Sequence, residues 1–404
     1  MLFALMFIKL RGLLSISMII FAANNILLYA NKENIKQYIK NPIYIGLTSI
    51  FFIVLFSGIN THDYNINAWL VWLRIKIPFL FMPLAFYLMP KIKIEKFYGL
   101  LYRYVILAAT VSFIFFLNYL IHYKAINDSY KHAKIMPLPT EHIRFSVMIC
   151  MAFFIGLYFI WKRIFATNKK LNLIIIISTI FLFLFIHILS VRSGLVSLYI
   201  GMILSLVYYI FYTKKYKIAI ISATILITLP IVAYWVLPSF QNKILYMKHD
   251  IKQYTSGKNI SQFSDSRRIV SYKGGIQIWK NNFLFGVGYG DIREEMDSFY
   301  KKNYPQLTDP EDRILPHNQF LWTAMGAGLI GLISLIIIFI IPLFNIENLR
   351  EPLFGIFFMS QAISFMFEHT IEAQIGTAFF IIFICLIMHF VQIKQQTTNS
   401  KEIE

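Results

Sequence analysis

The alternation of long apolar runs with short charged connectors constrains this chain more than any other feature. A bilayer core is crossed by a helix of about 20 apolar residues. Because lipid offers no hydrogen bonds to the backbone, such runs fold as helices. Eleven runs occur, at about 12–30, 43–59, 68–89, 97–121, 143–161, 171–189, 193–213, 217–237, 318–344, 353–367 and 373–392. The sequence therefore predicts an all-α polytopic transmembrane bundle of about 11 to 12 spans.

The composition supports a membrane protein and argues against a nucleic-acid partner. Hydrophobic residues make up 58% of the 404 residues and charged residues 14%, whereas a soluble domain has about 25% charged residues. The net charge of +18 is best explained by cytoplasmic connectors that face anionic membrane lipids. Cys150 and Cys385 lie inside apolar runs, so neither a disulfide nor a metal site is expected from them.

Lysines and arginines in the short connectors predict the orientation, because they favour the cytoplasmic side. The predicted cytoplasmic set is Lys32, Lys36, Lys40, Lys91, Lys93, Lys96, Lys162, Arg163, Lys169, Lys170, Lys214, Lys215, Lys217, Arg350, Lys394 and Lys401. The long loop, the 122–141 connector and Arg192 are then expected on the outer side. Eleven spans also place the N-terminus outside, although Lys9 and Arg11 favour the inside. Either the first 30 residues hold an irregular element or the true number of spans differs from eleven by one.

One long polar passage divides the chain. We expect a transmembrane bundle over 1–237, a loop domain over 238–317, transmembrane helices over 318–392 and a cytoplasmic tail over 393–404. Within the loop, Ser264 is typical of a helix start. One apolar stripe with spacings of three and four follows, formed by Ile269, Tyr272, Ile276, Trp279 and Phe283. Such a helix is expected to lie along the membrane surface or to pack on the bundle.

The glycine-spaced segment Gly286-Val287-Gly288-Tyr289-Gly290 is interpreted as a tight turn. It does not follow a predicted strand, and the chain contains no G-x-x-x-x-G-K-[ST] sequence. A nucleotide-binding loop is therefore not favoured.

Several arginines are candidates for binding an anion. Arg192 separates two apolar runs with almost no connector, a position that costs several kcal/mol unless the side chain faces a polar cavity, an anion or lipid headgroups. Arg267 and Arg268 fall in the first turn of the loop helix. A helix N-terminus with guanidinium groups suits phosphate oxygens, although a solvated face is the alternative. Arg144 opens a span, with an interfacial role and an anion-binding role equally favoured.

Two other positions carry polar side chains near the membrane edge. Arg74 and Lys76 are interpreted as cations that extend to the headgroups. His317 and Asn318 stand where the loop meets the next span, and no cluster with zinc-ligand spacing lies nearby in the sequence. A lone histidine is more often structural, but cations on the same side favour the neutral imidazole that a general base requires.

Over roughly residues 185–345, the sequence resembles the O-antigen ligase and Wzy-type polymerase superfamily. The resemblance rests on Arg268-(x)3-Tyr272, Trp279, Asn281-Asn282-(x)3-Gly286-Val287-Gly288, His317-Asn318-Gln319-Phe320-Leu321 and Gly326-(x)-Gly328-Leu329-Ile330-Gly331. It implies a bacterial inner-membrane enzyme that acts at the periplasmic face on a glycan carried by undecaprenyl pyrophosphate, without a metal or other cofactor.

The resemblance also implies roles for individual residues. His317 would activate the acceptor hydroxyl, and Arg192 and Arg268 would bind the pyrophosphate. Arg144 is a weaker candidate for the same task, and Arg267 could take the place of its neighbour. Asn318 could orient the histidine ring. The family has about twelve spans, so the N-terminal region departs from its pattern.

The acceptor is left open by the sequence. It is the lipid A-core oligosaccharide for a ligase, and another glycan or a protein for a polymerase or a protein O-oligosaccharyltransferase. A flippase or transporter of lipid-linked oligosaccharide is the alternative from another class. Transporters commonly carry internal repeats, and none is evident in the sequence. The absence of a D-x-D pair favours a lipid-linked donor over a metal-bound nucleotide sugar.

Overall fold

The chain folds as a helical membrane bundle. The computed structural model describes residues 1–8, 10–132, 134–255, 264–345 and 350–403, and every element in these ranges is helical. Within these described ranges, ten helical segments of 19 to 28 residues are long and apolar enough to cross a membrane. The predicted runs coincide with α2 (Arg11–Tyr29), α4 (Pro42–Ser57), α5 (Ile66–Leu88), α6 (Ile94–Ile121), α8 (His142–Trp161), α9 (Lys169–Leu189), α10 (Arg192–Thr213), α11 (Tyr216–Val236), α15 (Gln319–Ile340), α17 (Pro352–Phe367) and α18 (Gln374–Ile403). The all-α polytopic fold is confirmed, and the protein is a multi-pass membrane protein.

Two details refine the predicted span count. The run at 353–367 forms α17, which has only 16 residues and is shorter than the ten candidate spans. The first 30 residues hold two helices, because α1 (Leu2–Phe7) precedes α2. The irregular element suggested by the sequence is therefore present.

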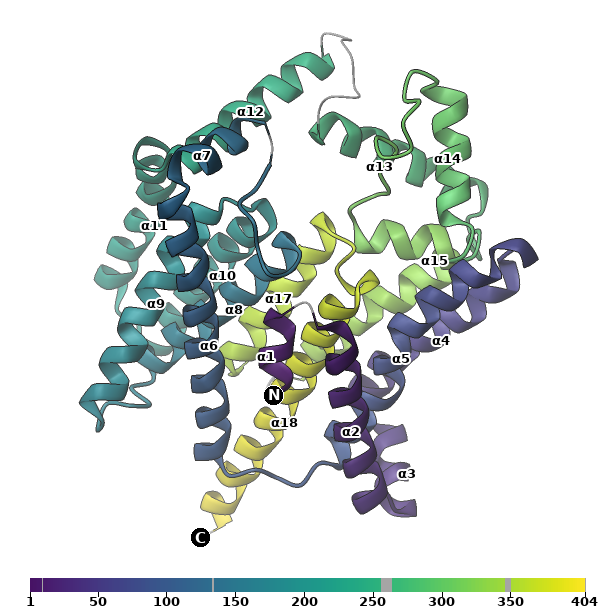
Figure 1. Cartoon of the computed structure of the whole chain (residues 1–404). Coiled ribbons are helices and arrows are strands. Elements are labelled where there is room, and N and C mark those ends of the chain that lie inside the picture. The colour runs from purple at the N-terminus through teal and green to yellow at the C-terminus, as the bar shows by residue number, and fades with distance from the viewer. Residues whose placement is uncertain (9, 133, 256–263, 346–349, 404) are drawn as a thin grey trace.

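The helices outside the apolar runs gather mainly at one end of the bundle (Figure 1). They are α7 (Tyr123–Lys131), α12 (Pro238–Thr255), α13 (Ser264–Asn281) and α14 (Ile292–Asn303). We call this end the loop side. The short helix α3 (Lys32–Lys40) lies at the opposite end (Figure 1). Arg11, at the start of α2, contacts Glu141 at 3.3 Å, so α2 begins on the loop side, as α8 does.

The reversal between α9 and α10 places an arginine at the start of a span. Asn168 caps α9 by accepting a hydrogen bond from the Leu171 amide at 3.1 Å. Ser190 ends the helix in the left-handed region with a φ of 51°, a conformation that terminates many helices. Because α10 begins only two residues later, Arg192 stands at the loop-side edge of the bundle.

The predicted apolar stripe on α13 is only partly covered by the protein, and the helix packs on the bundle through a different face. Ile276 and Phe283 are 42% and 46% exposed, whereas Val270 and Ile278 are buried. Two glycines explain the difference. A Cβ at Gly275 would stand 2.9 Å from Leu321, and one at Gly274 would stand 2.7 Å from Phe299. The face of α13 with the smallest side chains therefore packs closest to α14 and α15.

The glycine segment after α13 forms a tight turn, as expected. Gly286 and Gly288 have φ angles of 72° and 88°, which residues with a Cβ rarely adopt. The Val287 amide donates to the Met325 carbonyl at 2.8 Å, and the Gly288 amide donates to the Gly326 carbonyl at 3.1 Å. The turn is thus fixed to α15 and holds the loop helices against the bundle.

Candidate active site

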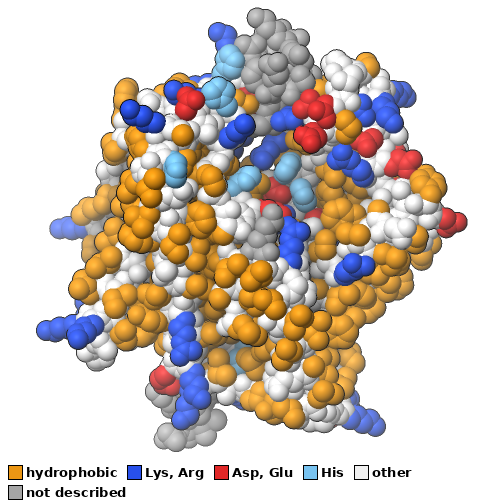
Figure 2. All heavy atoms as spheres, viewed as in Figure 1, with side chains coloured by type: hydrophobic (Ala, Val, Ile, Leu, Met, Phe, Trp, Pro, Cys, Tyr) orange, Lys and Arg blue, Asp and Glu red, His pale blue; other side chains and the backbone are white. Residues whose placement is uncertain are grey.

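A large cavity lies on the loop side between α8, α10, α12 and α13. Its volume is about 1080 Å³. The lining contains the cations Lys134, Arg192, Lys243 and Arg268, and among the residues that the structure describes Glu141 is its only acidic member. Apolar side chains complete the walls, among them Met136, Leu138, Leu195, Phe240, Met247 and Phe367. Figure 2 shows histidines and charged side chains gathered in a hollow on this side, above a face covered mainly by apolar side chains. The cavity therefore suits a ligand with an anionic group and an apolar chain.

Two of the arginines predicted to bind an anion line this cavity together. Arg192 comes from the first position of α10, and Arg268 comes from the first turns of α13. They are separated by the whole of α11 and α12, so their proximity depends on the fold. The predicted grouping of the long loop, the 122–141 connector and Arg192 on one side is confirmed, since all three contribute to the cavity.

Arg267 points to a different partner. Its Nη1 donates to the Asp312 carboxylate at 2.7 Å, and both side chains are about one quarter exposed, at 24% and 26%. It is absent from the cavity lining. Of the two neighbouring arginines, Arg268 is therefore the one positioned to contact a ligand in the cavity.

His317 is paired with a carboxylate that the sequence did not single out. Its Nδ1 lies 2.8 Å from Oε2 of Glu368, whose side chain is 3% exposed. The ring also lines a smaller cavity of about 390 Å³ together with His369, Arg293 and Arg313. An ionised carboxylate on Nδ1 favours the tautomer that carries its proton there. The Nε2 atom is then left as a hydrogen-bond acceptor.

Glu368 is held in its ionised form by its neighbours. Burial opposes ionisation, but His369, which is protonated at the low pH where Glu368 titrates, acts together with His317 and Arg144 to outweigh burial and lower the pKa of Glu368 from 4.5 to about 2. Arg144 approaches Oε1 of Glu368 at 3.8 Å and also forms an ion pair with Glu141. Burial lowers the pKa of His369 from 6.5 to about 4, so this ring is neutral near pH 7.

Arg144 thus contacts the carboxylate of the histidine site and does not line the large cavity. Its side chain is 8% exposed, and its Nε is 3.5 Å from the Thr370 carbonyl. The two roles weighed for Arg144 from the sequence were an interfacial role and direct anion binding. Its contacts with Glu141 and Glu368 give it a third arrangement, in which it supports the carboxylate that contacts His317.

A buried polar cluster anchors the segment that carries Glu368. Lys76 is fully buried and pairs with Glu372 at 2.9 Å, and it also contacts the Ile371 carbonyl. Gln319 donates to Glu372 at 2.6 Å and accepts from the Ile371 amide at 3.1 Å. The expectation that Lys76 extends to the headgroups is therefore wrong. Because its partner is almost 300 residues away in sequence, spacing gave no sign of the pair.

Asn318 has a structural task. Its side-chain oxygen accepts from the Leu321 amide at 2.9 Å, which caps α15. Its amide nitrogen donates to the Met366 carbonyl at 3.0 Å. The second bond links the start of α15 to the end of α17, and the ring contact predicted for Asn318 is instead made by Glu368.

Tyr272 connects the two cavities. It lines the large cavity beside Arg268, and its hydroxyl donates to the His317 carbonyl at 2.7 Å. Burial raises the pKa of Tyr272, so the hydroxyl keeps its proton near neutral pH. The cationic cavity and the histidine therefore lie on either side of one aromatic side chain.

The histidine site also has the composition of a metal site. His317, Glu368 and His369 each offer a ligand atom, and these atoms lie within 4.8 Å of one another. The Glu368 oxygens, however, already contact the two rings at 2.8 Å and 3.3 Å, and the Arg144 cation stands 3.8 Å away. A nearby cation opposes metal binding electrostatically. The arrangement fits a hydrogen-bonded His–Glu pair better than a metal centre.

A model of a known protein family matches the region that carries most of these residues. The profile of the O-antigen ligase family, Wzy_C, matches residues 177–336. The matched region includes Arg192, Arg268 and His317, but it ends before Glu368. No curated protein matches the chain. The family match supports glycan transfer of the ligase or polymerase type and implies lipid-linked glycan substrates.

Proposed function

We propose that this chain, whose residues 177–336 belong to the O-antigen ligase family, transfers a glycan from undecaprenyl pyrophosphate to an acceptor glycan. The loop side would then face the periplasm of a bacterial inner membrane. The lipid A-core oligosaccharide is our first candidate for the acceptor. The observation that supports this function best is the convergence of Arg192 and Arg268 on one cavity beside His317 and its carboxylate partner.

The large cavity would hold the donor. Arg192 and Arg268 offer forked hydrogen-bond donors, which suit phosphate oxygens. Lys134 and Lys243 add positive charge to the same lining. As the bond between the sugar C1 and the phosphate oxygen breaks, negative charge builds up on the leaving pyrophosphate. Fixed cations stabilise such a developing charge, and they make an acid that protonates the leaving group unnecessary.

His317 would act as the general base. With its proton held on Nδ1 by Glu368, its Nε2 can accept the proton of the acceptor hydroxyl while the acceptor oxygen attacks the sugar C1. The imidazolium that forms would be stabilised by the adjacent carboxylate. The products are the glycosylated acceptor and the lipid pyrophosphate, and the proton leaves from His317 in a later step. No metal is required in this sequence of events.

The neighbouring arginines allow a sharp test of donor binding. In purified enzyme supplied with lipid-linked donor and acceptor, Arg268→Ala and Arg192→Ala are expected to abolish transfer while the protein stays folded and inserted. Arg268→Lys should restore little activity, because the planar fork is lost. Arg267→Ala is the matched control, since it removes an equal charge one residue away but only breaks the Asp312 pair.

The outcome that contradicts this assignment is also specific. If Arg267→Ala abolishes transfer and Arg268→Ala does not, the cavity that binds the pyrophosphate has been assigned to the wrong arginine. If both variants remain fully active, the cationic cavity is not the donor site.

A further inference from the structure

A second, separate groove runs between α2 and α5. Its volume is about 780 Å³. Small residues on α2, including Ala22 and Ala23, together with Pro78 inside α5, leave this space open. The remaining lining is mostly apolar, with Met18, Ile19, Ile26, Leu27, Ile75, Ile77, Phe81 and Met82. The groove therefore offers an extended apolar surface within a membrane-crossing part of the bundle.

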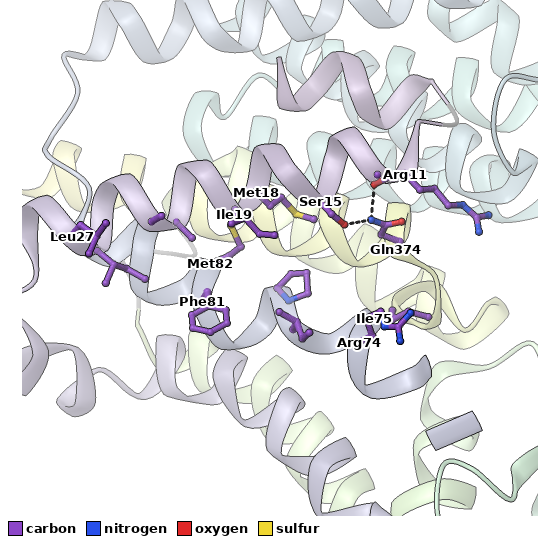
Figure 3. Close-up of a pocket in the computed structure, with 16 residues that line it drawn as sticks. Arg11, Ser15, Met18, Ile19, Leu27, Arg74, Ile75, Phe81, Met82 and Gln374 are labelled. Carbon is purple, nitrogen blue, oxygen red and sulfur yellow. Dashed lines mark hydrogen bonds between the residues drawn. The ribbon is translucent and has the colours of Figure 1, made fainter. Parts of the chain in front are cut away.

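Charge is found at only one end of this groove. Figure 3 shows Arg11 and Arg74 at one end and Leu27 at the other. No acidic side chain lines the groove in the described part of the chain. From Arg11 to Leu27, α2 rises roughly 24 Å at 1.5 Å per residue, which exceeds one leaflet of a hydrocarbon core about 30 Å thick. An extended lipid chain with an anionic head matches this distribution of apolar surface and charge.

The charged end of the groove is connected to the proposed active site by a chain of ion pairs. Arg11 contacts Glu141 at 3.3 Å, and Glu141 pairs with Arg144. Arg144 lies 3.8 Å from Glu368, which contacts His317 at 2.8 Å. Glu141 also lines the large cationic cavity. The groove and the cavity therefore open on either side of the same short segment at the start of α8.

The start of α18 also lies next to both the α2–α5 groove and the segment that carries Glu368. Gln374 lines the groove, donates to the Arg11 carbonyl at 2.8 Å and contacts the Ser15 hydroxyl. It stands only two residues after Glu372, which anchors the segment carrying Glu368. A ligand head at Arg11 is thus close in the fold to the general base.

We propose that the α2–α5 groove binds the lipid anchor of the acceptor, a membrane glycolipid with a phosphorylated head. This inference rests on the proposed function, since it assigns the second substrate of the same reaction. The donor and the acceptor would then each have a cationic site with an apolar extension, and Glu141 would stand between the two sites, since it contacts Arg11 and lines the large cavity. A lipid-anchored acceptor favours a ligase or a polymerase over an enzyme that glycosylates proteins.

The test fills the groove without changing the active site. Ala23 is exposed and lines the groove, so Ala23→Trp occupies the space of the lipid chain. Leu28 is on the same helix, 65% exposed and outside the lining, so Leu28→Trp is the matched control. Each variant is assayed with a lipid-anchored acceptor and with the same glycan released from its lipid.

Ala23→Trp is expected to raise the KM for the anchored acceptor about tenfold, as the loss of about two buried methylene groups predicts. The KM for the donor, the kinetics with the released glycan and all values for Leu28→Trp should stay unchanged. Arg74→Glu should raise the same KM through its effect on the phosphorylated head. Equal changes for anchored and released acceptors, or no change for either, would overturn the proposal.

A binding measurement separates this inference from the proposed function. If the wild-type enzyme transfers no glycan from any lipid-linked donor, the proposed function fails, but binding of the anchored acceptor in nanodiscs without donor still decides the groove. Saturable binding that Ala23→Trp weakens and Leu28→Trp preserves supports the groove. Binding that bulk phospholipid displaces equally well would show that the groove holds bilayer lipid, which contradicts the proposal.

Discussion

Replacing Glu368 by glutamine tests the carboxylate that the fold places on His317. The pKa of Glu368 falls from 4.5 to about 2. At about 1.4 kcal/mol per pH unit, this shift sets an upper limit of roughly 3 kcal/mol on the net attraction for the ionised form, because the His369 contribution is lost near pH 7, where that ring is neutral. Glutamine keeps the size of the side chain but removes this attraction. It also offers either a carbonyl or an amide to Nδ1, so the tautomer of His317 is no longer fixed.

The expected result is a fall in kcat of about 100-fold to 10,000-fold, the range for general-base catalysis and for loss of a carboxylate that orients a catalytic histidine. The KM for the donor should change little, because Glu368 does not line the large cavity proposed to hold the donor. Thermal unfolding in detergent must be measured in parallel, since the same substitution removes a buried ion pair.

Glu372→Gln is the control for a purely structural effect. Glu372 is buried as deeply as Glu368 but pairs with Lys76 instead of His317. If Glu368→Gln and Glu372→Gln lose the same stability and the same activity, Glu368 acts only on folding. A folded Glu368→Gln enzyme with the wild-type kcat would refute the His–Glu pair.

Two further predictions concern stability. The folded state favours neutral His369, so this residue adds to the free energy of unfolding in full above its unfolded pKa of 6.5. This stabilisation is lost as the pH falls through the folded pKa of about 4. Unfolding scans between about pH 8 and about pH 5 should therefore show a loss of about 2 kcal/mol in the free energy of unfolding. Glu368 likewise stabilises the folded state above pH 4.5, and this stabilisation is lost as the pH falls towards its folded pKa of about 2. A free energy of unfolding that rises on acidification would contradict the pKa shifts of both residues. Lys76→Met leaves Glu372 buried without its cation and should destabilise the protein by about 3–5 kcal/mol, measured by thermal unfolding. Adding Glu372→Gln should recover part of this loss, and no recovery would show that the pair is not the cause.

The fold could be predicted because membrane helices are specified by local composition. A run of apolar residues must form a helix in lipid regardless of its neighbours in space, and all the predicted runs coincide with helices. An irregular N-terminal region was expected because eleven spans place the N-terminus outside, whereas Lys9 and Arg11 favour the inside. The packing of α13 was not predicted, since Gly274 and Gly275 bring one face close to its neighbours and the stripe of larger apolar residues faces elsewhere.

The candidate site was only half visible in the sequence. Arg192 and His317 are candidates because charged or polar groups beside apolar runs are rare, and Arg268 is a candidate because a helix N-terminus with guanidinium groups suits phosphate oxygens. Glu368 and Lys76 are equally unusual, but their meaning depends on partners distant in sequence. The choice between Arg267 and Arg268 likewise required the Asp312 contact. Residue types can suggest a cationic site and a base, whereas the pairing of buried charges is decided by the fold.

In the proposed mechanism, His317 takes the proton of the acceptor hydroxyl. Its most direct test is the single-turnover rate of purified His317→Ala with saturating lipid-linked donor and acceptor. We predict a loss of at least about 100-fold, with unchanged donor binding, unchanged thermal stability and no effect of chelators on the wild-type rate. If His317→Ala folds normally and transfers glycan at the wild-type rate, His317 is not the base.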